Sequence, residues 1–341
     1  GIFDPTDNKK NALKRAKLIL KEMNQQGYIT KDQYDKAVAD DFEAKIHSNA
    51  LNNQLDNNEV ALAVDSATKI LMGQQDFRFQ YQFDSKEEED RYNEEYSSAY
   101  NKVYQRILSG GYQISTNIDT GLHDQLQGIV SNVMNAWQDR SGDNNFYTKQ
   151  AAMTVIDNPT GDVVASIGGR GEEGNHYNRA FLSYRQPGSA IKPLVSYAPA
   201  YERGLLETSV VSDDRPNNTY PNNVYNSSKG NLTLRNALAI SSNVVAYKLA
   251  DENRNELKEA VYQPLAQMQF TGLDVADDNP IIAVGGMTYG ATTQEMASGI
   301  ATLVNQGNYR APLNIQTIKR KDNGQEIFSQ NDIAQQKIYS D

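Results

Sequence analysis

The first forty residues carry apolar side chains at the spacing of an amphipathic helix. Five of them fall on one helical face: Ala12, Ala16, Ile19, Leu20 and Met23. Gly27 is placed to end this helix and Thr30 to cap a second one, which predicts a helical hairpin over residues 1–45. Residues 46–110 are polar and acidic, and "DSKEEEDRYNEEY" carries carboxylates through a helix start. This stretch predicts a helical linker region with a solvated face.

From residue 111 onward the apolar pattern changes from helical spacing to strict alternation. Four residues alternate as they do in a strand: Tyr112, Ile114, Thr116 and Ile118. Five residues then return to helical spacing: Leu122, Leu126, Ile129, Val130 and Val133. The stretch "AAMTVIDNPTGDVVASIGG" places two apolar runs around residues 158–161. The pattern therefore predicts a strand, a long helix and a β-hairpin with a longer turn.

Helical signals dominate the remainder of the chain. A helix is expected to begin near Ser189, and another apolar helical stretch is interrupted by "SSN" at 241–243. Thr292 or Thr293 can cap a further helix that has Glu295 in its first turn and runs to Gly307. Residues 111–341 thus combine strands with flanking helices, so we expect an α+β (mixed α/β) domain after the hairpin and the linker.

Composition and charge remove several classes of function. The 341 residues carry a net charge of −10 at pH 7 and include no cysteine. The acidic balance argues against a nucleic-acid binder, which would need clustered Lys and Arg. The three histidines, His47, His123 and His176, are scattered, so neither a zinc site nor a Ser-His-Asp triad is expected, and no metal or cofactor is predicted. The chain opens at Gly1 without a signal segment, as an excised piece of a longer protein would.

The stretch "RQPGSAIKP" offers a nucleophile together with its own base. On a helix Ser189 and Lys192 share a face, and the lysine amine is able to reach the serine oxygen. Burial would lower the pKa of the amine and leave it neutral. Free backbone N–H groups at the helix start favour a developing oxyanion. The pattern therefore suits acyl transfer without histidine.

The spacing alone does not single out this serine. Ser66 and Lys69 have the same spacing, and the Ser-x-Asn pattern of 241–243 recurs at 115–117 and 329–331. The structural alternatives are that Ser189 merely caps a helix with Lys192 in solvent, and that "SSN" is a polar patch that breaks a helix. Context favours Ser189, because it follows Pro-Gly at a helix start whereas Ser66 lies within an apolar helical run.

Read together, the two motifs resemble the transpeptidase domain of class A penicillin-binding proteins. "QPGSAIKP" is followed by "SSN" within "LTLRNALAISSNVVAYKLA", and the superfamily signature is Ser-x-x-Lys, a Ser-Asp-Asn-type triplet and Lys-Thr-Gly. "DNPTGDVVASIGG" resembles the hairpin before the family's active-site helix. "NALKRAKLILKEMNQQGYITKDQYDKA" resembles the tail of an upstream glycosyltransferase domain. The resemblance implies a penicillin-binding (serine-lysine transpeptidase) fold, with an antiparallel sheet flanked by helices, in residues 111–341.

The resemblance also implies roles for four residues. Ser189 would be the acylated nucleophile, Lys192 its base, Ser241 the hydroxyl that passes a proton to the leaving group, and Asn243 a holder of the substrate amide. The implied substrates are peptidoglycan stem peptides ending in D-Ala-D-Ala, and β-lactams would acylate the same serine. The implied location is the extracytoplasmic face of the bacterial membrane, with an anchor upstream of Gly1.

One departure from the family pattern matters. No Lys-Thr-Gly or Lys-Ser-Gly occurs before Asp341, although in the family that strand contributes substrate contacts and part of the oxyanion hole. We expect a truncated or cleaved chain rather than a degenerate enzyme, or a second polypeptide that supplies the strand. The catalytic segment of the glycosyltransferase is missing too, so no glycan polymerisation is expected of this chain.

Two other functions stay open on the sequence. The same serine and lysine would serve a D,D-carboxypeptidase or a β-lactamase-like hydrolase, in which water takes the acyl group. A non-catalytic penicillin-binding sensor or wall-binding scaffold would keep the fold without turnover. The N-terminal hairpin argues against a stand-alone hydrolase, and no membrane signalling segment of a sensor is visible.

Overall fold

A computed structural model describes residues 9–40, 58–141, 145–171, 177–218, 220–252 and 258–340. Its contacts divide the chain into two compact units, one of residues 1–55 with 108–110 and one of residues 56–107 with 111–341. His47 and His176 lie outside the described residues. No described helix is both long and apolar enough to cross a membrane.

The first unit contains the predicted helical hairpin. Its helices are α1 (Lys9–Gln25) and α2 (Lys31–Ala39). Gly27 adopts φ +78°, the left-handed conformation that ends a helix, as the sequence predicted. Thr30 and Gln33 form a capping box at the start of α2, in which the Thr30 Oγ1 accepts from the Gln33 N–H at 3.2 Å.

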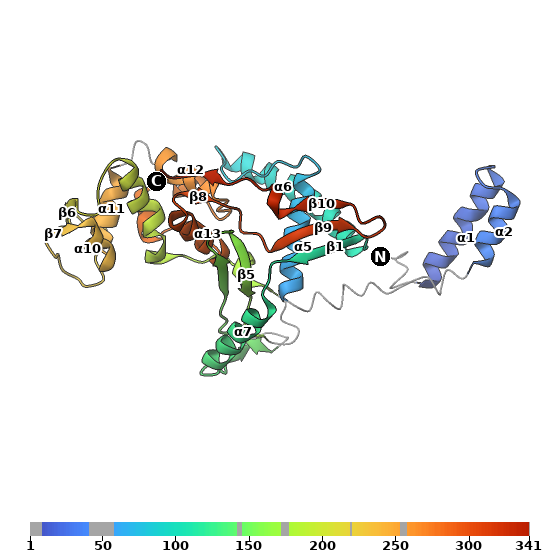
Figure 1. Cartoon of the computed structure of the whole chain (residues 1–341), viewed down its shortest axis with the longest axis horizontal. Helices are drawn as coiled ribbons and strands as arrows, with labels where there is room; N and C mark the ends of the chain where they lie inside the picture. Colours follow the sequence, from blue (N-terminus) through green and yellow to red (C-terminus); the bar gives the residue numbers. More distant parts are fainter. Residues whose placement is uncertain are drawn as a thin grey trace. The chain divides into compact units, whose positions relative to one another are not determined.

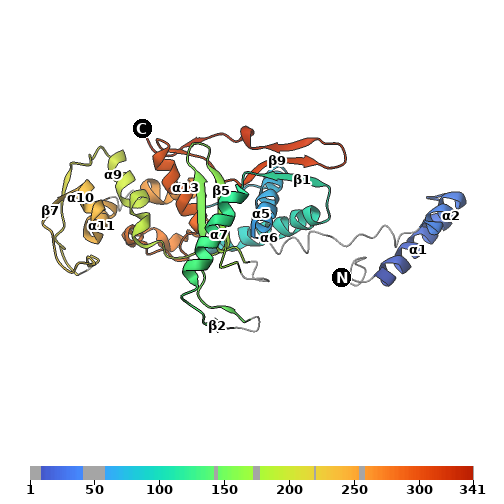
Figure 2. The same ribbon diagram turned by 60° about the horizontal axis from the view of Figure 1, so that its bottom comes forward.

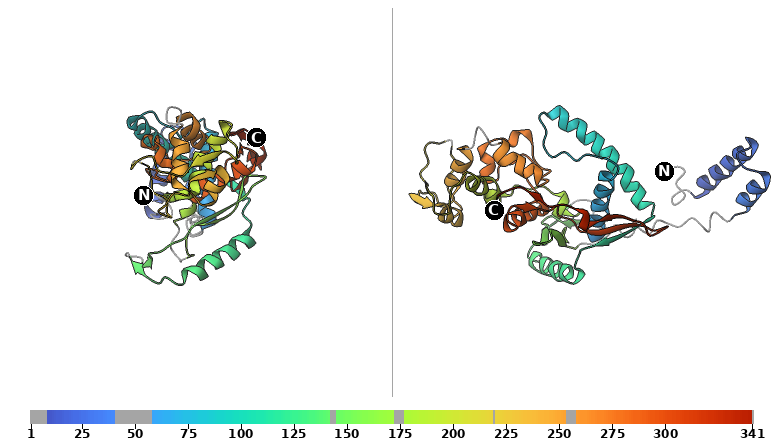
Figure 3. Two further views of the ribbon diagram at one scale, coloured as in Figure 1. Left: turned by 90° about the vertical axis from the view of Figure 1, so that its left-hand side faces the viewer. Right: turned by 45° about the horizontal axis from the view of Figure 1, so that its top comes forward.

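The second unit begins with two helices, α5 (Asn58–Gly73) and α6 (Lys86–Leu108). Figure 3 shows them crossing next to the sheet, and the Tyr100 hydroxyl of α6 donates to Asp65 of α5 at 2.8 Å. The acidic run of α6 is not wholly solvated, because Glu89 is buried and accepts from Lys86 at 2.9 Å. The prediction of a solvated face is therefore wrong at Glu89, where an i,i+3 lysine neutralises the carboxylate.

Strands β1 (Tyr112–Thr116), β9 (Ile315–Arg320) and β10 (Glu326–Ser329) form an antiparallel sheet in the order β1-β9-β10. The predicted hairpin is present as the antiparallel pair β4 (Met153–Asp157) and β5 (Asp162–Ile167). Val163 N–H donates to Leu313 O at 2.9 Å, which joins the hairpin to the segment before β9. Helices α7 (Thr120–Met134) and α13 (Thr293–Val304) lie on opposite sides of the hairpin (Figures 1 and 2).

Short elements complete the unit around this sheet. The remaining strands form small antiparallel pairs: β2 (Arg140–Ser141) with β3 (Phe146–Tyr147), β6 (Val210–Ser212) with β7 (Asn231–Thr233), and β8 (Asn308–Tyr309) with β11 (Gln336–Lys337). The short helices include α8 (Arg179–Leu182), α10 (Leu234–Ala239), α11 (Asn243–Asp251), α12 (Gln263–Gln267) and η5 (Pro280–Val284).

The helix expected at Ser189 is a sequence of three helical forms. A 3-10 turn η1 (Gly188–Ile191) is followed by a π-helical segment η2 (Pro193–Tyr197) and then by α9 (Ala198–Glu202). Pro193 and Pro199 have no N–H to donate, so regular α-helical bonding is interrupted at both positions. The main apolar core surrounds η2 and includes Leu194, Leu249 and Phe270.

Candidate active site

Lys192 lies at the junction of η1 and η2 and is completely buried. Its Nζ donates three hydrogen bonds, to Ser241 O at 2.7 Å, to Ser241 Oγ at 3.0 Å and to Asn243 Oδ1 at 2.7 Å. Burial lowers the pKa of the Lys192 ammonium to about 8, since the charged form loses its hydration. All three acceptors are uncharged, so this lysine, unlike most buried lysines, has no carboxylate partner among these contacts.

Ser189 is exposed and lies inside η1, the second residue of the turn. Pro187 occupies the N-cap position, and no side chain caps this turn. The alternative in which Ser189 is a helix cap is therefore wrong. The alternative that placed Lys192 in solvent is wrong as well, because its side chain is buried. No hydrogen bond joins Ser189 Oγ to Lys192 Nζ among the described residues, since the amine directs its protons to Ser241 and Asn243.

The triplet 241–243 separates two helices rather than interrupting one. α10 ends at Ala239, and Ser242 is the N-cap of α11, where its Oγ accepts from Val245 N–H at 3.0 Å. Ser241 has φ +55°, a left-handed conformation that costs a non-glycine residue about 1 kcal/mol. That conformation allows both the carbonyl and the hydroxyl of Ser241 to face Lys192.

A buried polar cluster that the sequence did not predict holds the triplet in place. Asp213 is 1% exposed and accepts from Ser242 Oγ, from Asn223 Nδ2 at 3.0 Å and from Tyr225 OH at 2.8 Å. Asn223 Oδ1 accepts from Asn243 N–H at 2.8 Å. Asp213 and Asn223 thus bind the two residues that follow Ser241, Ser242 and Asn243, from a loop distant in sequence. Polar loop residues are too common for the sequence to single them out.

Burial alone would raise the pKa of Asp213. The hydrogen bonds that its carboxylate accepts outweigh burial and lower the pKa below its ordinary value. Asp213 is therefore ionised at neutral pH, and its charge is compensated by neutral donors. The 241–243 triplet is therefore held by the buried Asp213 carboxylate rather than by a solvent-exposed group.

Backbone contacts fix the turn that carries Ser189. Arg185 and Ala291 exchange two backbone hydrogen bonds, of 3.0 and 2.9 Å. Gly285 ends η5 with φ +84°, and a Cβ at this position would lie 2.4 Å from Gly188 Cα. Only glycine permits this approach, which presses the end of η5 against the residue before the serine.

The competing motifs lie in other settings. Ser66 and Lys69 are on α5, and Lys69 Nζ pairs with Asp65 at 2.9 Å, an ion pair that outweighs partial desolvation and raises the lysine pKa. Ser115 lies in β1 and Ser329 in β10. Among the described residues, one group could arrange ligands around a cation: Glu59, His123 and Asp124, whose ligand atoms lie within 4.8 Å of one another.

Comparison with known proteins places the chain in a family. Residues 151–339 match the model of the penicillin-binding protein transpeptidase domain. Penicillin-binding protein 1A of Clostridium perfringens strain 13 is 30% identical over 329 residues, which cover 88% of this chain and 44% of that protein. Penicillin-binding protein 1A of Streptococcus oralis is 30% identical over 349 residues, with 96% of this chain and 47% of that protein covered. The chain spans less than half the length of these relatives.

Solved structures share the fold. The penicillin-binding protein PonA1 from Mycobacterium tuberculosis in complex with penicillin V aligns with a TM-score of 0.57 and 22% identity, over 72% of this chain and 65% of that one. Penicillin-binding protein 1A from Haemophilus influenzae aligns with a TM-score of 0.51 and 17% identity, over 96% of this chain and 57% of that one. The predicted α+β fold and the predicted resemblance are confirmed. The chain belongs to the penicillin-binding protein transpeptidase family and is related over most of its length to class A penicillin-binding proteins.

Proposed function

We propose that this chain provides the acylation site of a serine-type D-Ala-D-Ala transpeptidase that cross-links peptidoglycan stem peptides. The observation that carries the proposal is the buried amine of Lys192, which is bonded to Ser241 and Asn243 and lies three residues after the exposed Ser189. A buried lysine with a pKa of about 8 is available as a base near neutral pH.

In the proposed reaction Ser189 Oγ bonds to the carbonyl carbon of the penultimate D-Ala, and its proton passes to the neutral amine of Lys192. The C–N bond to the terminal D-Ala then breaks, and the leaving nitrogen takes a proton from Lys192 through the Ser241 hydroxyl. An amine of a second stem peptide attacks the resulting ester and loses a proton to Lys192, which passes it to Ser189 Oγ. Ser189 is released as the hydroxyl, and Asn243 holds the substrate amide.

Neutral Lys192 has a lone pair and only two protons, whereas three contacts surround its Nζ. Ser241 O and Asn243 Oδ1 can only accept, so the two N–H groups of the neutral amine donate their hydrogen bonds to them. The third contact, Ser241 Oγ, then donates its own proton to the lone pair. This arrangement supports Ser241 as the group that relays protons between the amine and the leaving nitrogen.

The remaining parts of the proposal extend beyond these 341 residues. The relatives are more than twice as long as the aligned part, and no Lys-Thr-Gly or Lys-Ser-Gly occurs here, so we propose that a further segment supplies that strand. Residues 1–45 would be the tail of a glycosyltransferase domain, 46–110 the linker and 111–341 the transpeptidase domain. We place the protein on the extracytoplasmic face of the membrane, held by an anchor upstream.

The decisive test is labelling of the full-length protein with a fluorescent penicillin. We expect a stable covalent adduct that Ser189→Ala abolishes. Ser66→Ala is the matched control, because Ser66 has the same spacing to a lysine but lies on α5, and it should label as the parent does. Labelling that survives Ser189→Ala would rule out the proposed nucleophile.

A second measurement separates the transpeptidase from a hydrolase and from a sensor. With a stem peptide ending in D-Ala-D-Ala and an amine acceptor, we expect release of D-Ala to be accompanied by a cross-linked product. Release into water alone, with rapid loss of the penicillin adduct, would favour the D,D-carboxypeptidase or β-lactamase-like alternative. A lasting adduct with no release of D-Ala would favour the sensor or scaffold.

A further inference from the structure

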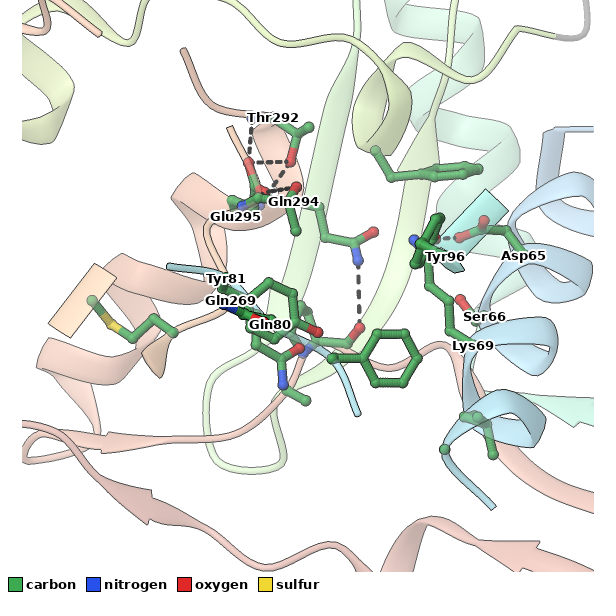
Figure 4. Close-up of a pocket in the computed structure, with 18 of the residues that line it drawn as sticks. Asp65, Ser66, Lys69, Gln80, Tyr81, Tyr96, Gln269, Thr292, Gln294 and Glu295 are labelled. Carbon is green, nitrogen blue, oxygen red and sulfur yellow. Dashed lines mark hydrogen bonds and ion pairs between the residues drawn. The ribbon is translucent and has the colours of Figure 1, made fainter. Parts of the chain in front are cut away.

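A cavity lies away from the candidate active site. It has a volume of about 560 Å³ and opens between α5, the segment 79–83, α6 and the residues around 269 and 294 (Figure 4). None of the four site residues, Ser189, Lys192, Ser241 and Asn243, lines it. Small-molecule binding sites typically have a volume in this range and are lined by aromatic side chains with a few polar groups, as this cavity is.

Aromatic rings held in fixed positions form one part of the wall. Phe79 and Tyr81 stack with their ring centroids 6.4 Å apart and their planes at 9°. Tyr96 stacks on Tyr100, and Tyr100 on Tyr104, each at 5.8 Å, along one face of α6. Only Tyr96 of this ladder lines the cavity. Rigid rings of this kind provide contact area at little cost in entropy.

The charged groups of the wall already have ion-pair or hydrogen-bond partners, including Glu89, which accepts from Lys86. Lys69 is bonded to Asp65 at 2.9 Å. The Glu295 carboxylate accepts from the backbone and hydroxyl of Thr271 and of Thr292, at distances of 2.7 to 3.1 Å. A phosphate or a carboxylate ligand would need a cation without an ion pair, and an ammonium ligand would need a carboxylate whose acceptor positions are free, whereas Glu295 already accepts four hydrogen bonds. The wall therefore favours an uncharged ligand.

Several polar groups of the wall have hydrogen-bonding capacity to spare. Among the described residues the hydroxyls of Tyr81 and Tyr96 and the side-chain amide of Gln269 have no hydrogen-bond partner, and Gln294 Oε1 is buried without one. Burial raises the pKa of Tyr96 to about 12, so its phenol stays neutral and can both donate and accept. In Figure 4 Tyr96 lies across the open space from Tyr81 and Gln269.

We propose that this cavity binds an uncharged N-acetylated oligosaccharide. A pyranose ring has an apolar C–H face that fits an aromatic ring, and hydroxyl groups at its edge that fit phenols and amides. An acetamide group supplies one donor and one acceptor, the complement of a glutamine side chain such as Gln269. The identification of peptidoglycan as the source of the saccharide rests on the proposed function, whereas the binding itself does not.

The test uses the 341-residue chain and calorimetric titration with two probes, triacetylchitotriose and cellotriose, which differ in their acetamide groups. We expect saturable binding of triacetylchitotriose and weaker binding of cellotriose. Tyr96→Ala should weaken the affinity for triacetylchitotriose at least tenfold. The matched control is Tyr104→Ala, in the same ladder but outside the cavity, and its affinity should stay within twofold of the parent.

Gln269→Gly provides a second variant in case Tyr96→Ala fails to fold. Gln269 has φ +60°, which glycine adopts without strain, so the change removes the amide and spares the backbone. It should also weaken binding at least tenfold. The proposal is overturned if the parent shows no saturable binding at millimolar triacetylchitotriose, if the folded variants bind as the parent does, or if cellotriose binds equally well. Penicillin labelling of Ser189 in the full-length protein is a separate readout, so the two proposals can fail independently.

Discussion

At the scale of single residues, the unusual feature of this protein is a fully buried lysine surrounded by neutral acceptors. Lys192 gives up hydration without gaining a carboxylate, and its lowered pKa of about 8 expresses that loss. Lys69 shows the opposite case, since Asp65 stabilises its charge and raises its pKa. The two lysines in Ser-x-x-Lys motifs of this chain therefore differ in how readily they lose a proton, because their surroundings shift their pKa values in opposite directions.

The pKa of Lys192 predicts how acylation depends on pH. The amine is a base only when neutral, so the rate of penicillin acylation of the full-length protein should rise with pH and level off above about 8. Stopped-flow fluorescence between pH 6 and 10 measures this profile. Lys192→Ala should lower the rate by roughly 10²- to 10⁴-fold and remove the rise. A rate that is constant over this range in the parent would contradict the role of the amine.

Asp213 offers a second test, of positioning rather than of chemistry. Asp213→Asn keeps the shape but replaces one of the two carboxylate oxygens by an NH2 donor, which then faces either Ser242 or Tyr225 and should cost roughly 1–3 kcal/mol of folding free energy. A displaced triplet should slow acylation by up to about 10²-fold, with the pH midpoint of the profile shifted as the contacts of Lys192 change. Chemical denaturation and the same stopped-flow assay measure both effects. Loss of stability with an unchanged rate and midpoint would make Asp213 purely structural.

The candidate residues were within reach of sequence reasoning, but their support was not. Ser189, Lys192, Ser241 and Asn243 come in two short motifs that can be read locally. Asp213 and Asn223 act across a fold that brings a loop against the start of α11. Hydrogen bonds between residues this far apart in the chain follow from no local sequence pattern, so they are seen only in the three-dimensional structure.

At the scale of secondary structure elements, local signals explain which predictions held. The capping box of Thr292 and Glu295, the β4-β5 hairpin and the end of α1 at Gly27 are each fixed by neighbours in sequence. The 3-10 and π-helical bonding from Gly188 to Tyr197 is different, because Pro193 and Pro199 interrupt regular α-helical bonding without specifying which helical form replaces it. The periodicity of apolar residues does not distinguish these helical forms from an α-helix.

The contact between η5 and the serine turn gives a prediction at this scale. Gly285→Ala places a Cβ against Gly188 and strains a φ of +84°, so the turn that carries Ser189 must shift. We expect a lower melting temperature and slower penicillin acylation of the full-length protein. Gly324→Ala is the matched control, because Gly324 has φ +69° but no atom within 4 Å of the added Cβ.

The control should cost about 1 kcal/mol of stability through its backbone conformation and leave acylation unchanged. The difference between the two variants therefore isolates the close approach to Gly188 from the general cost of a left-handed alanine. Equal acylation rates in the two variants would show that the turn tolerates the displacement.

At the scale of the whole molecule, α5 is joined to α7 and to the β4-β5 hairpin through a histidine and a glutamate. His123 of α7 is buried, its Nδ1 lies 2.7 Å from Glu59 Oε1 of α5, and its Nε2 faces Ser166 O of β5 at 3.2 Å. The hydrogen bond with Glu59 raises the pKa of His123 above its ordinary value. One imidazole thus connects α5, α7 and the hairpin.

Because the folded pKa of His123 is raised, its contribution to stability is fully present below the unfolded pKa of about 6.5 and is lost as pH rises through the folded value. Glu59→Gln should therefore destabilise the 341-residue chain by roughly 1 kcal/mol at pH 6, and by less at pH 9. Thermal melting at both pH values measures the difference. Asp124→Asn is the control, since Asp124 is 83% exposed and lies 3.9 Å from the same nitrogen, and it should have little effect at either pH. An equal destabilisation by Glu59→Gln at pH 6 and pH 9 would mean that Glu59 holds α5 by packing and not by pairing with a protonated histidine.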